Sequence, residues 1–242
     1  MKKIAFVFSC FFALAACASS SNNLGENPSA EALYNKGYKE LNKTSYAKAA
    51  ATFEKVELEH PYSKWATKAK IMGAYAYYKD QKYDDAIMSL DRFIRYHPGN
   101  KDIAYAYYMR GLCYYEQIVG IEKDQGNTRE AMNAFNQVIA RFPDSEYAQD
   151  AKAKMNLIRD HLAGQEMEVG RFYLRQKNYL SALNRFSEVV NNYQTTGHIE
   201  EALYRQAEVY KILGMNKEFN YAVKVLGHNY PDSKWYKRAQ KL

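Results

Sequence analysis

Apolar residues recur along the chain at fixed distances before an anchor residue, which is proline in four of five cases. The anchors are Pro61, Pro98, Pro143, Gln194 and Pro231, and counting back 12, 8 and 5 residues from each gives an apolar trio. The trios are Ala49, Phe53 and Val56; Ala86, Leu90 and Phe93; Ala131, Phe135 and Val138; Ala182, Phe186 and Val189; and Phe219, Val223 and Leu226. Spacings of four and three place each trio on one helix face. Because proline cannot continue a helix, the pattern predicts five helices that end at the anchors.

A second helix is predicted before each trio, marked by a small residue. The small residues are Gly37, Ala74, Gly111, Gly170 and Ala207, and a tyrosine follows three residues later in the last four copies. A small residue lets paired helices approach closely, and we expect the tyrosine to fill the gap between them. The third copy is eight residues longer than the others, and the extra residues fall within the polar stretch GIEKDQGNTRE.

Each anchor is followed two residues later by a residue that favours helix N-caps. These residues are Ser63, Asn100, Ser145, Thr196 and Ser233. Their side-chain oxygens can accept from the free backbone N–H groups of a new helix. The anchor segment therefore predicts the end of one helix and the start of the next, once per helix pair.

Helix pairs that repeat about every 34 residues are typical of tetratricopeptide repeats. We therefore predict an all-α solenoid of five helix pairs. The distance from anchor to next small residue is 13 in three cases but 27 between Pro143 and Gly170. The surplus of 14 is close to four helical turns, so it keeps the next helix in phase. One long helix from Glu146 to about Gln176 is expected to join repeats three and four. It divides the folded part into residues 28–145 and 146–242.

The first residues have the pattern of a lipoprotein signal peptide. Two lysines precede an apolar run of 13 residues, Ile4 to Ala16, which is too short to span a membrane. The sequence Leu14-Ala15-Ala16-Cys17 resembles the bacterial lipobox, in which the cysteine is acylated, with palmitate among the acyl chains, and becomes the N-terminus after cleavage. This predicts a signal peptide at 1–16 and a tether at 17–27. By resemblance to lipoprotein sorting, Ala18 favours the outer membrane. An ordinary secretory signal is the alternative.

Composition and motifs give little support for catalysis or for binding nucleic acid. Of the three cysteines, only Cys113 would remain as a free thiol, and we expect it to be buried. The net charge of +7 becomes +5 without Lys2 and Lys3, and basic residues are scattered among acids. No HExxH motif, cysteine pair or phosphate-binding loop is present, so we expect no enzyme, metal or cofactor.

Tetratricopeptide repeats bind partners through the first helix of each pair, and its outward positions can be counted from the small residue. In repeats one to three these positions hold the tyrosines Tyr34, Tyr38, Tyr75, Tyr78, Tyr108 and Tyr115, together with Leu41, Ile71 and Leu112. In repeats four and five they hold Met167, Arg171, Leu174, Tyr204, Glu208 and Lys211. Tyrosine combines apolar area with a hydroxyl at low entropy cost, which suits binding of an extended peptide. Ordinary packing between repeats is the alternative for several of these tyrosines.

Three short runs accompany the lipobox and the repeats: AYYK at 76–79, DRFIR at 91–95 and YMRGL at 108–112. Together they resemble the BamD family, lipoproteins of the outer-membrane β-barrel assembly (BAM) machine. Glu40 in repeat one and Gln194 in repeat four depart from the pattern. The resemblance implies a non-enzymatic scaffold on the periplasmic face of the outer membrane, beside other BAM lipoproteins.

The resemblance also implies two binding roles. The N-terminal repeats would recognise unfolded β-barrel proteins, and the C-terminal repeats would dock on the POTRA domains of the barrel subunit BamA. Arg171, Arg185 and Lys211 are the candidates for contacts with acidic groups there. Two alternatives remain: a periplasmic adaptor of the CpoB kind, which couples cell-wall synthesis to envelope constriction, and an enzyme acting on peptidoglycan.

Overall fold

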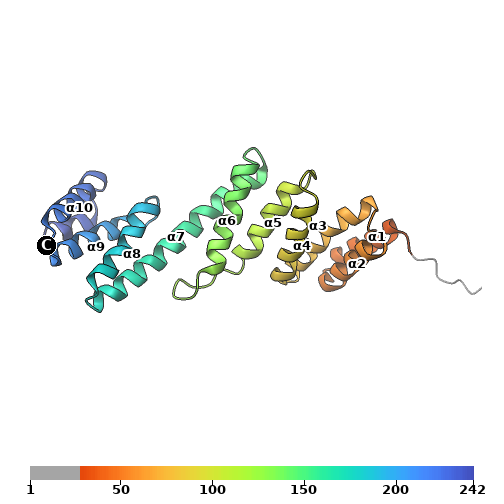
Figure 1. Cartoon of the computed structure of the whole chain (residues 1–242), viewed down its shortest axis with the longest axis horizontal. Helices are drawn as coiled ribbons and strands as arrows, with labels where there is room; N and C mark the ends of the chain where they lie inside the picture. Colours follow the sequence, from red (N-terminus) through yellow and green to blue (C-terminus); the bar gives the residue numbers. More distant parts are fainter. Residues whose placement is uncertain (1–27) are drawn as a thin grey trace, which may run out of the picture.

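The computed structural model describes residues 28–242, so the predictions for the signal peptide, Cys17 and the tether lie outside the described residues. Within this range the chain forms eleven helices and no strand, and successive helices pack on one another along an elongated rod (Figure 1). The helices are α1 (Ala30–Asn42), α2 (Tyr46–Glu59), α3 (Lys64–Lys79), α4 (Tyr83–Tyr96), α5 (Ile103–Tyr115), α6 (Gly126–Arg141), α7 (Glu146–Arg175), α8 (Tyr179–Asn192), α9 (Ile199–Ile212), α10 (Asn216–Asn229) and α11 (Lys234–Ala239). The predicted solenoid of five helix pairs is confirmed, and α11 follows the fifth pair.

The predicted apolar trios form the core of the first four repeats. Four phenylalanines are fully buried: Phe53, Phe93, Phe135 and Phe186. Each belongs to a different apolar cluster. The fifth repeat differs, because α10 buries Ala222 and Leu226 while Phe219 and Val223 stay partly exposed. The buried face of α10 is therefore turned relative to the predicted one.

In repeats one, three and four the small residue is a glycine that packs directly against the phenylalanine in the middle of the trio. An added Cβ would lie 2.9 Å from Phe53 at Gly37, 2.7 Å from Phe135 at Gly111 and 2.5 Å from Phe186 at Gly170. Such distances are shorter than carbon atoms tolerate. In repeats two and five the small residue is alanine, and the middle residue is the smaller Leu90 or Val223. Glycine thus pairs with phenylalanine, and alanine pairs with leucine or valine, which keeps the summed volume of each pair similar.

Three of the five predicted N-caps are confirmed. The side chains of Ser63, Ser145 and Ser233 each accept a hydrogen bond from a backbone N–H in the first turn of α3, α7 and α11. The predictions for Asn100 and Thr196 are wrong, because α5 begins at Ile103 and α9 at Ile199. Asn100 Oδ1 instead accepts from the N–H of Asp102, and the Thr196 hydroxyl donates to the carbonyl of Tyr193. Both side chains thus close a turn that delays the helix.

The turn inside four of the five pairs uses one residue with a left-handed backbone. These residues are Thr44, Gln81, Lys177 and Gly214, with φ between 57° and 73°. Each lies seven residues after the small residue of its repeat. Three of the four are not glycine, although glycine adopts this conformation at lower cost.

The long helix predicted from Glu146 is confirmed as α7, which has 30 residues. The extra residues of repeat three form the loop at 116–125, which folds back toward α7, where Ile121 lies near Gly164. Gln125 is fully buried in this loop and hydrogen-bonds to the carbonyls of Gly120 and Lys123 and to Thr128. The boundary between the two halves at residue 145 stays a prediction.

Candidate functional site

A row of tyrosines crosses the first helices of repeats one to three. We call it the tyrosine surface, and it consists of Tyr34, Tyr38, Tyr75, Tyr78, Tyr108 and Tyr115. They come from α1, α3 and α5, two from each helix. Tyr38 is 47 % exposed, and the other five are half-buried. The six side chains therefore differ in how much ring area they offer to a partner.

Tyr34 and Tyr108 contribute to packing between repeats. The Tyr34 ring lies 4.8 Å from that of Trp65, and the Tyr108 ring stacks at 5.3 Å on that of Tyr147. The same arrangement recurs in repeat five, where Tyr204 lies 5.2 Å from Trp235. In all three cases the partner lies four residues after an anchor proline.

Three of the apolar residues that were predicted at outward positions, by counting from the small residue, are buried. Leu41, Ile71 and Met167 belong to the core, so their prediction as groove residues is wrong. Ile71 and Met167 occupy the position of Tyr34 and Tyr108 in repeats two and four. That position packs against the next repeat in the described chain, and the neighbouring element covers its side chain whether it is aromatic or aliphatic.

The remaining tyrosines keep part of their rings or hydroxyls available. The Tyr78 hydroxyl donates to Glu116 at 3.2 Å, an exposed contact between α3 and the residue after α5. Tyr115 meets the edge of Phe135, and the Lys154 ammonium lies 5.6 Å from its ring. Tyr75 packs between the clusters of repeats one and two.

Two tyrosines near this surface were missed by the sequence reasoning. Tyr105 at the start of α5 and Tyr147 at the start of α7 have ring centroids 5.5 Å apart. The signal for Tyr147 was the aromatic residue four positions after proline, shared with Trp65 and Trp235. No repeated pattern marks Tyr105. These rings join the tyrosines of α3 and α5 to the start of the long helix.

The tyrosine surface carries protonated hydroxyls beside carboxylates. Burial, followed by the nearby Glu116 carboxylate, raises the pKa of Tyr78 to about 12. Burial and a hydrogen bond to Asp150 raise the pKa of Tyr108, and the same hydrogen bond lowers the pKa of Asp150. Tyr78 and Tyr108 therefore keep their protons and Asp150 stays negative near pH 7, which favours ligand groups that donate hydrogen bonds.

Two of the three cationic docking candidates already have partners within the chain. Arg171 pairs with Glu168 at 2.9 Å and Glu201 at 3.3 Å, and Arg185 pairs with Glu166 at 3.0 Å. The Lys211 ammonium lies 4.8 Å from the Phe219 ring. The three side chains come from α7, α8 and α9. An acidic partner would have to exchange with these carboxylates at Arg171 and Arg185.

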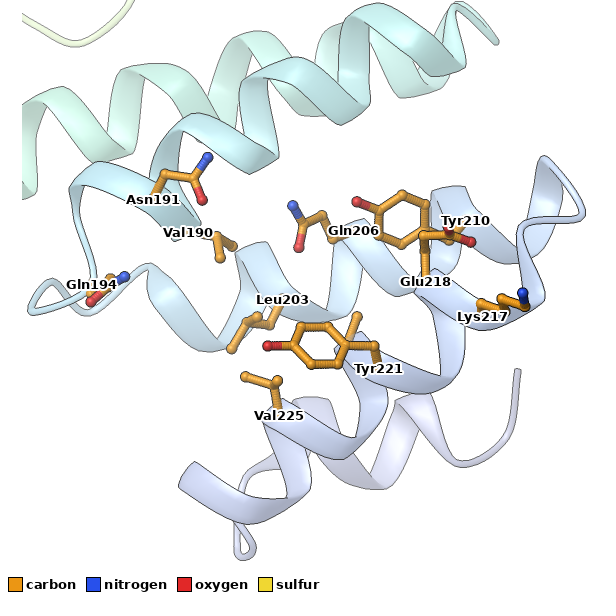
Figure 2. A pocket seen from close by; sticks show the side chains of 11 residues that line it. Val190, Asn191, Gln194, Leu203, Gln206, Tyr210, Lys217, Glu218, Tyr221 and Val225 are labelled. Carbon is orange, nitrogen blue, oxygen red and sulfur yellow. The ribbon is translucent and has the colours of Figure 1, made fainter.

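A cavity of about 640 Å³ lies between α8, α9 and α10 (Figure 2). Leu203, Val225 and Tyr221 form an apolar part of its wall, and Gln206 and Tyr210 add polar groups. The sequence reasoning did not predict this cavity, because it looked for a ligand-binding groove on the first helices alone, whereas two of the three helices around the cavity, α8 and α10, are second helices.

Among residues 28–242, no group of three or more His, Cys, Asp or Glu could hold a metal ion. Cys113 is buried, as expected, and burial raises the pKa of its thiol to about 12, which keeps it unreactive at neutral pH. In the same range, every helix is too short or too polar to cross a membrane.

Sequence comparison with known proteins gives matches over most of the chain. The family model YfiO, described as an outer membrane lipoprotein, matches residues 26–226. A Rickettsia prowazekii protein named outer membrane protein assembly factor BamD is 47 % identical over 210 residues, which cover 87 % of this chain and 84 % of that one. The chain belongs to the BamD (YfiO) family. The predicted family resemblance is thereby confirmed.

Further BamD relatives cover nearly the whole chain. The protein of Caulobacter vibrioides is 40 % identical over 95 % of this chain and 76 % of its own length. That of Neisseria meningitidis serogroup B is 35 % identical over 98 % of this chain and 95 % of its own. A solved tetratricopeptide repeat protein of Parabacteroides merdae aligns with 87 % of this chain and 70 % of its own, at 17 % identity and a TM-score of 0.44. Because that likeness is distant, the fold rests on the repeats themselves.

Proposed function

We propose that this chain is a non-catalytic lipoprotein scaffold of the outer-membrane β-barrel assembly complex. It would be anchored through acylated Cys17, face the periplasm and recognise unfolded β-barrel proteins. Membership of the BamD family supports the assembly role, since the relatives above are named assembly factors. The same relatives favour it over the cell-wall adaptor and over an enzyme.

The tyrosine surface is the observation that carries the proposed substrate binding. Tyr38, Tyr75, Tyr78 and Tyr115 take no part in the aromatic stacks with the next repeat, so their accessible area is free for a ligand. An extended β-barrel strand with aromatic and alternating apolar residues would bury those side chains on the rings. The Tyr78 oxygen and the Glu116 carboxylate would accept from its backbone N–H groups.

The second half of the chain would dock on the POTRA domains of BamA, beside the other BAM lipoproteins. Arg171, Arg185 and Lys211 are the proposed contacts. Two of them are held by carboxylates of this chain, which fixes their side chains before a partner arrives. Acidic groups of the partner would replace or share these pairs, and such exchange gives specificity more than raw affinity.

A peptide-binding experiment tests the substrate role. We expect Tyr38→Ala combined with Tyr78→Ala to weaken binding of a labelled C-terminal β-barrel peptide by about tenfold to thirtyfold. The reason is that each ring should contribute about 1 kcal/mol to the binding free energy. Fluorescence anisotropy measures the affinity. Tyr62→Ala combined with Tyr96→Ala is the matched control, since both tyrosines are largely exposed and lie outside the tyrosine surface. Equal affinity of the wild type and the first variant, with intact helical circular dichroism, would contradict the proposal.

The lipid anchor has its own test. We expect Cys17→Ala to leave a precursor that is neither acylated nor held in the outer membrane. Metabolic labelling with a fatty acid and membrane fractionation measure both properties. An acylated Cys17→Ala protein in the outer membrane would remove the assignment of Cys17.

A further inference from the structure

Positive charge is concentrated in the last part of the chain. Residues 216–242 hold six Lys and Arg against two Asp and Glu, a net charge of +4, whereas residues 28–215 hold 26 against 24. Four of the six cations lie in or just after α11. We call Lys234, Lys237, Arg238 and Lys241 the basic end.

The four cations of the basic end lie at spacings of three, four and seven, so they form one stripe along α11 and the turn after it. All four are exposed, and none pairs with a carboxylate within 4 Å among residues 28–242. The backbone of α11 that carries them is held in place, because Trp235 packs on Tyr204 and Ala239 is buried. The result is an exposed, ordered row of charges that the fold leaves uncompensated.

Equivalent positions elsewhere in the solenoid show how unusual this row is. Trp235 is flanked by Lys234 at 5.3 Å and Arg238 at 4.9 Å. Trp65 has the same flanking pair, Lys64 and Lys68, but Thr67 and Ile71 stand at the positions of Lys237 and Lys241. The next cation there, Lys70, lies 4.0 Å from the Glu57 carboxylate. At the third aromatic position the charge is reversed, since Glu146 and Asp150 flank Tyr147.

We propose that the basic end binds the anionic headgroups of a phospholipid surface. The cations sit on an outward helix face, which suits a planar array of phosphates. The chain belongs to a family of outer membrane lipoproteins, so it works next to a bilayer. Each Lys or Arg near an anionic membrane contributes about 1 kcal/mol, so four together give a contact that salt can weaken.

This contact would orient the whole molecule. In Figure 1, α1 and α10 lie at opposite ends of the long axis, and α11 packs on α9 and α10. The proposed lipid anchor precedes α1, so on its own it would hold only that end of the rod. With the basic end on the bilayer as well, the rod lies along the membrane, and the tyrosine surface keeps one orientation to it. The orientation rests on the proposed anchor, whereas the headgroup contact does not.

Energy transfer between the last residue and the membrane tests the proposal. Full-length purified protein carrying Leu242→Cys can be labelled there with a donor dye, because the Cys113 thiol is buried and its pKa is raised to about 12. The labelled protein is mixed with vesicles that contain acceptor lipids. One set is phosphatidylethanolamine with phosphatidylcholine, and the other contains phosphatidylglycerol. We expect several-fold higher transfer on the anionic vesicles and its loss at high salt.

Variants decide whether the basic end causes the transfer. Lys234→Gln, Lys237→Gln and Lys241→Gln together should reduce transfer on anionic vesicles to the neutral level. The matched control carries Lys36→Gln, Lys64→Gln and Lys68→Gln, removes the same charge and should transfer like the unmodified chain. Equal transfer on both vesicle types, or an unaffected first variant, would overturn the proposal.

Two further outcomes are informative. If the chain fails to float with neutral vesicles, the anchor is wrong; the measurement is then made on a chain that also carries Cys10→Ser and Cys17→Ser, so that transfer on anionic vesicles still reports the basic end. If vesicles give no transfer while the three lysines are protected from acetylation in intact envelopes, an acidic protein covers them and the lipid proposal fails.

Discussion

Replacing Gly111 by alanine tests how the paired helices approach each other. The added Cβ would lie 2.7 Å from two ring atoms of Phe135, where carbon atoms normally stay about 3.5–4.0 Å apart. Relieving this overlap requires a shift of about 1 Å in a fully buried ring, and overpacking of this kind costs about 1–3 kcal/mol. Alanine regains about 1 kcal/mol of helix propensity. We therefore expect a net loss of up to about 2 kcal/mol in the free energy of unfolding.

The chain itself supplies the rescue. Repeat two pairs Ala74 with Leu90, so Gly111→Ala combined with Phe135→Leu reproduces a pair that already exists. Phe135→Leu alone should cost about 1–2 kcal/mol through the cavity it leaves. The double variant should be more stable than the sum of the two losses by about 1 kcal/mol or more, as expected for residues in contact.

Urea unfolding followed by circular dichroism measures these differences. Gly73→Ala is the matched control, because this buried glycine of α3 leaves a new Cβ 3.4 Å from its nearest neighbour, an ordinary contact. That variant should be as stable as the unmodified chain or more stable. A Gly111→Ala protein that gains stability like the control, or a double variant whose losses simply add, would refute the pairing of small residue and ring volume.

Three further predictions concern turns, caps and charges. Gln81→Gly should raise the free energy of unfolding by about 0.5–1 kcal/mol in urea titration, since Gln81 has φ = 60° and glycine adopts that conformation without a clash; a loss would show that its side chain matters. Ser145→Ala should lower it by about 1 kcal/mol by removing the N-cap of α7, and no change would contradict that role. Asp150→Asn should destabilise the protein at pH 7. The Tyr108 hydrogen bond lowers the Asp150 pKa, so its contribution is present above about pH 4 and lost on acidification through the lowered pKa; a difference from wild type that persists unchanged at lower pH would contradict this.

The sequence predicted the repeat architecture because its signals are local and redundant. Proline ends four of the five second helices, because it lacks the N–H donor and clashes with the preceding turn, and in the first four repeats the trio at spacings of four and three forms one buried face. The length of α7 followed from counting turns, and its bounds are within one residue of the expected ones. These features need no knowledge of neighbouring repeats.

The details that failed depend on neighbours or on competing hydrogen bonds. Counting from the small residue predicted outward positions for Ile71 and Met167, but the next repeat covers both side chains. Asn100 and Thr196 have the right chemistry for capping but bond within their own turn. The role of Tyr34 became visible only with Trp65, 31 residues further along the chain. Which tyrosines bind a ligand therefore cannot be read from the repeat alone.

Copurification tests the central claim most directly. The full-length chain, tagged at its C-terminus, is purified from detergent-solubilised envelopes of a Gram-negative host, and the accompanying proteins are identified by mass. The account predicts a stoichiometric partner that combines POTRA domains with a β-barrel. Recovery of cell-wall synthases or division proteins in its place would contradict the assembly function.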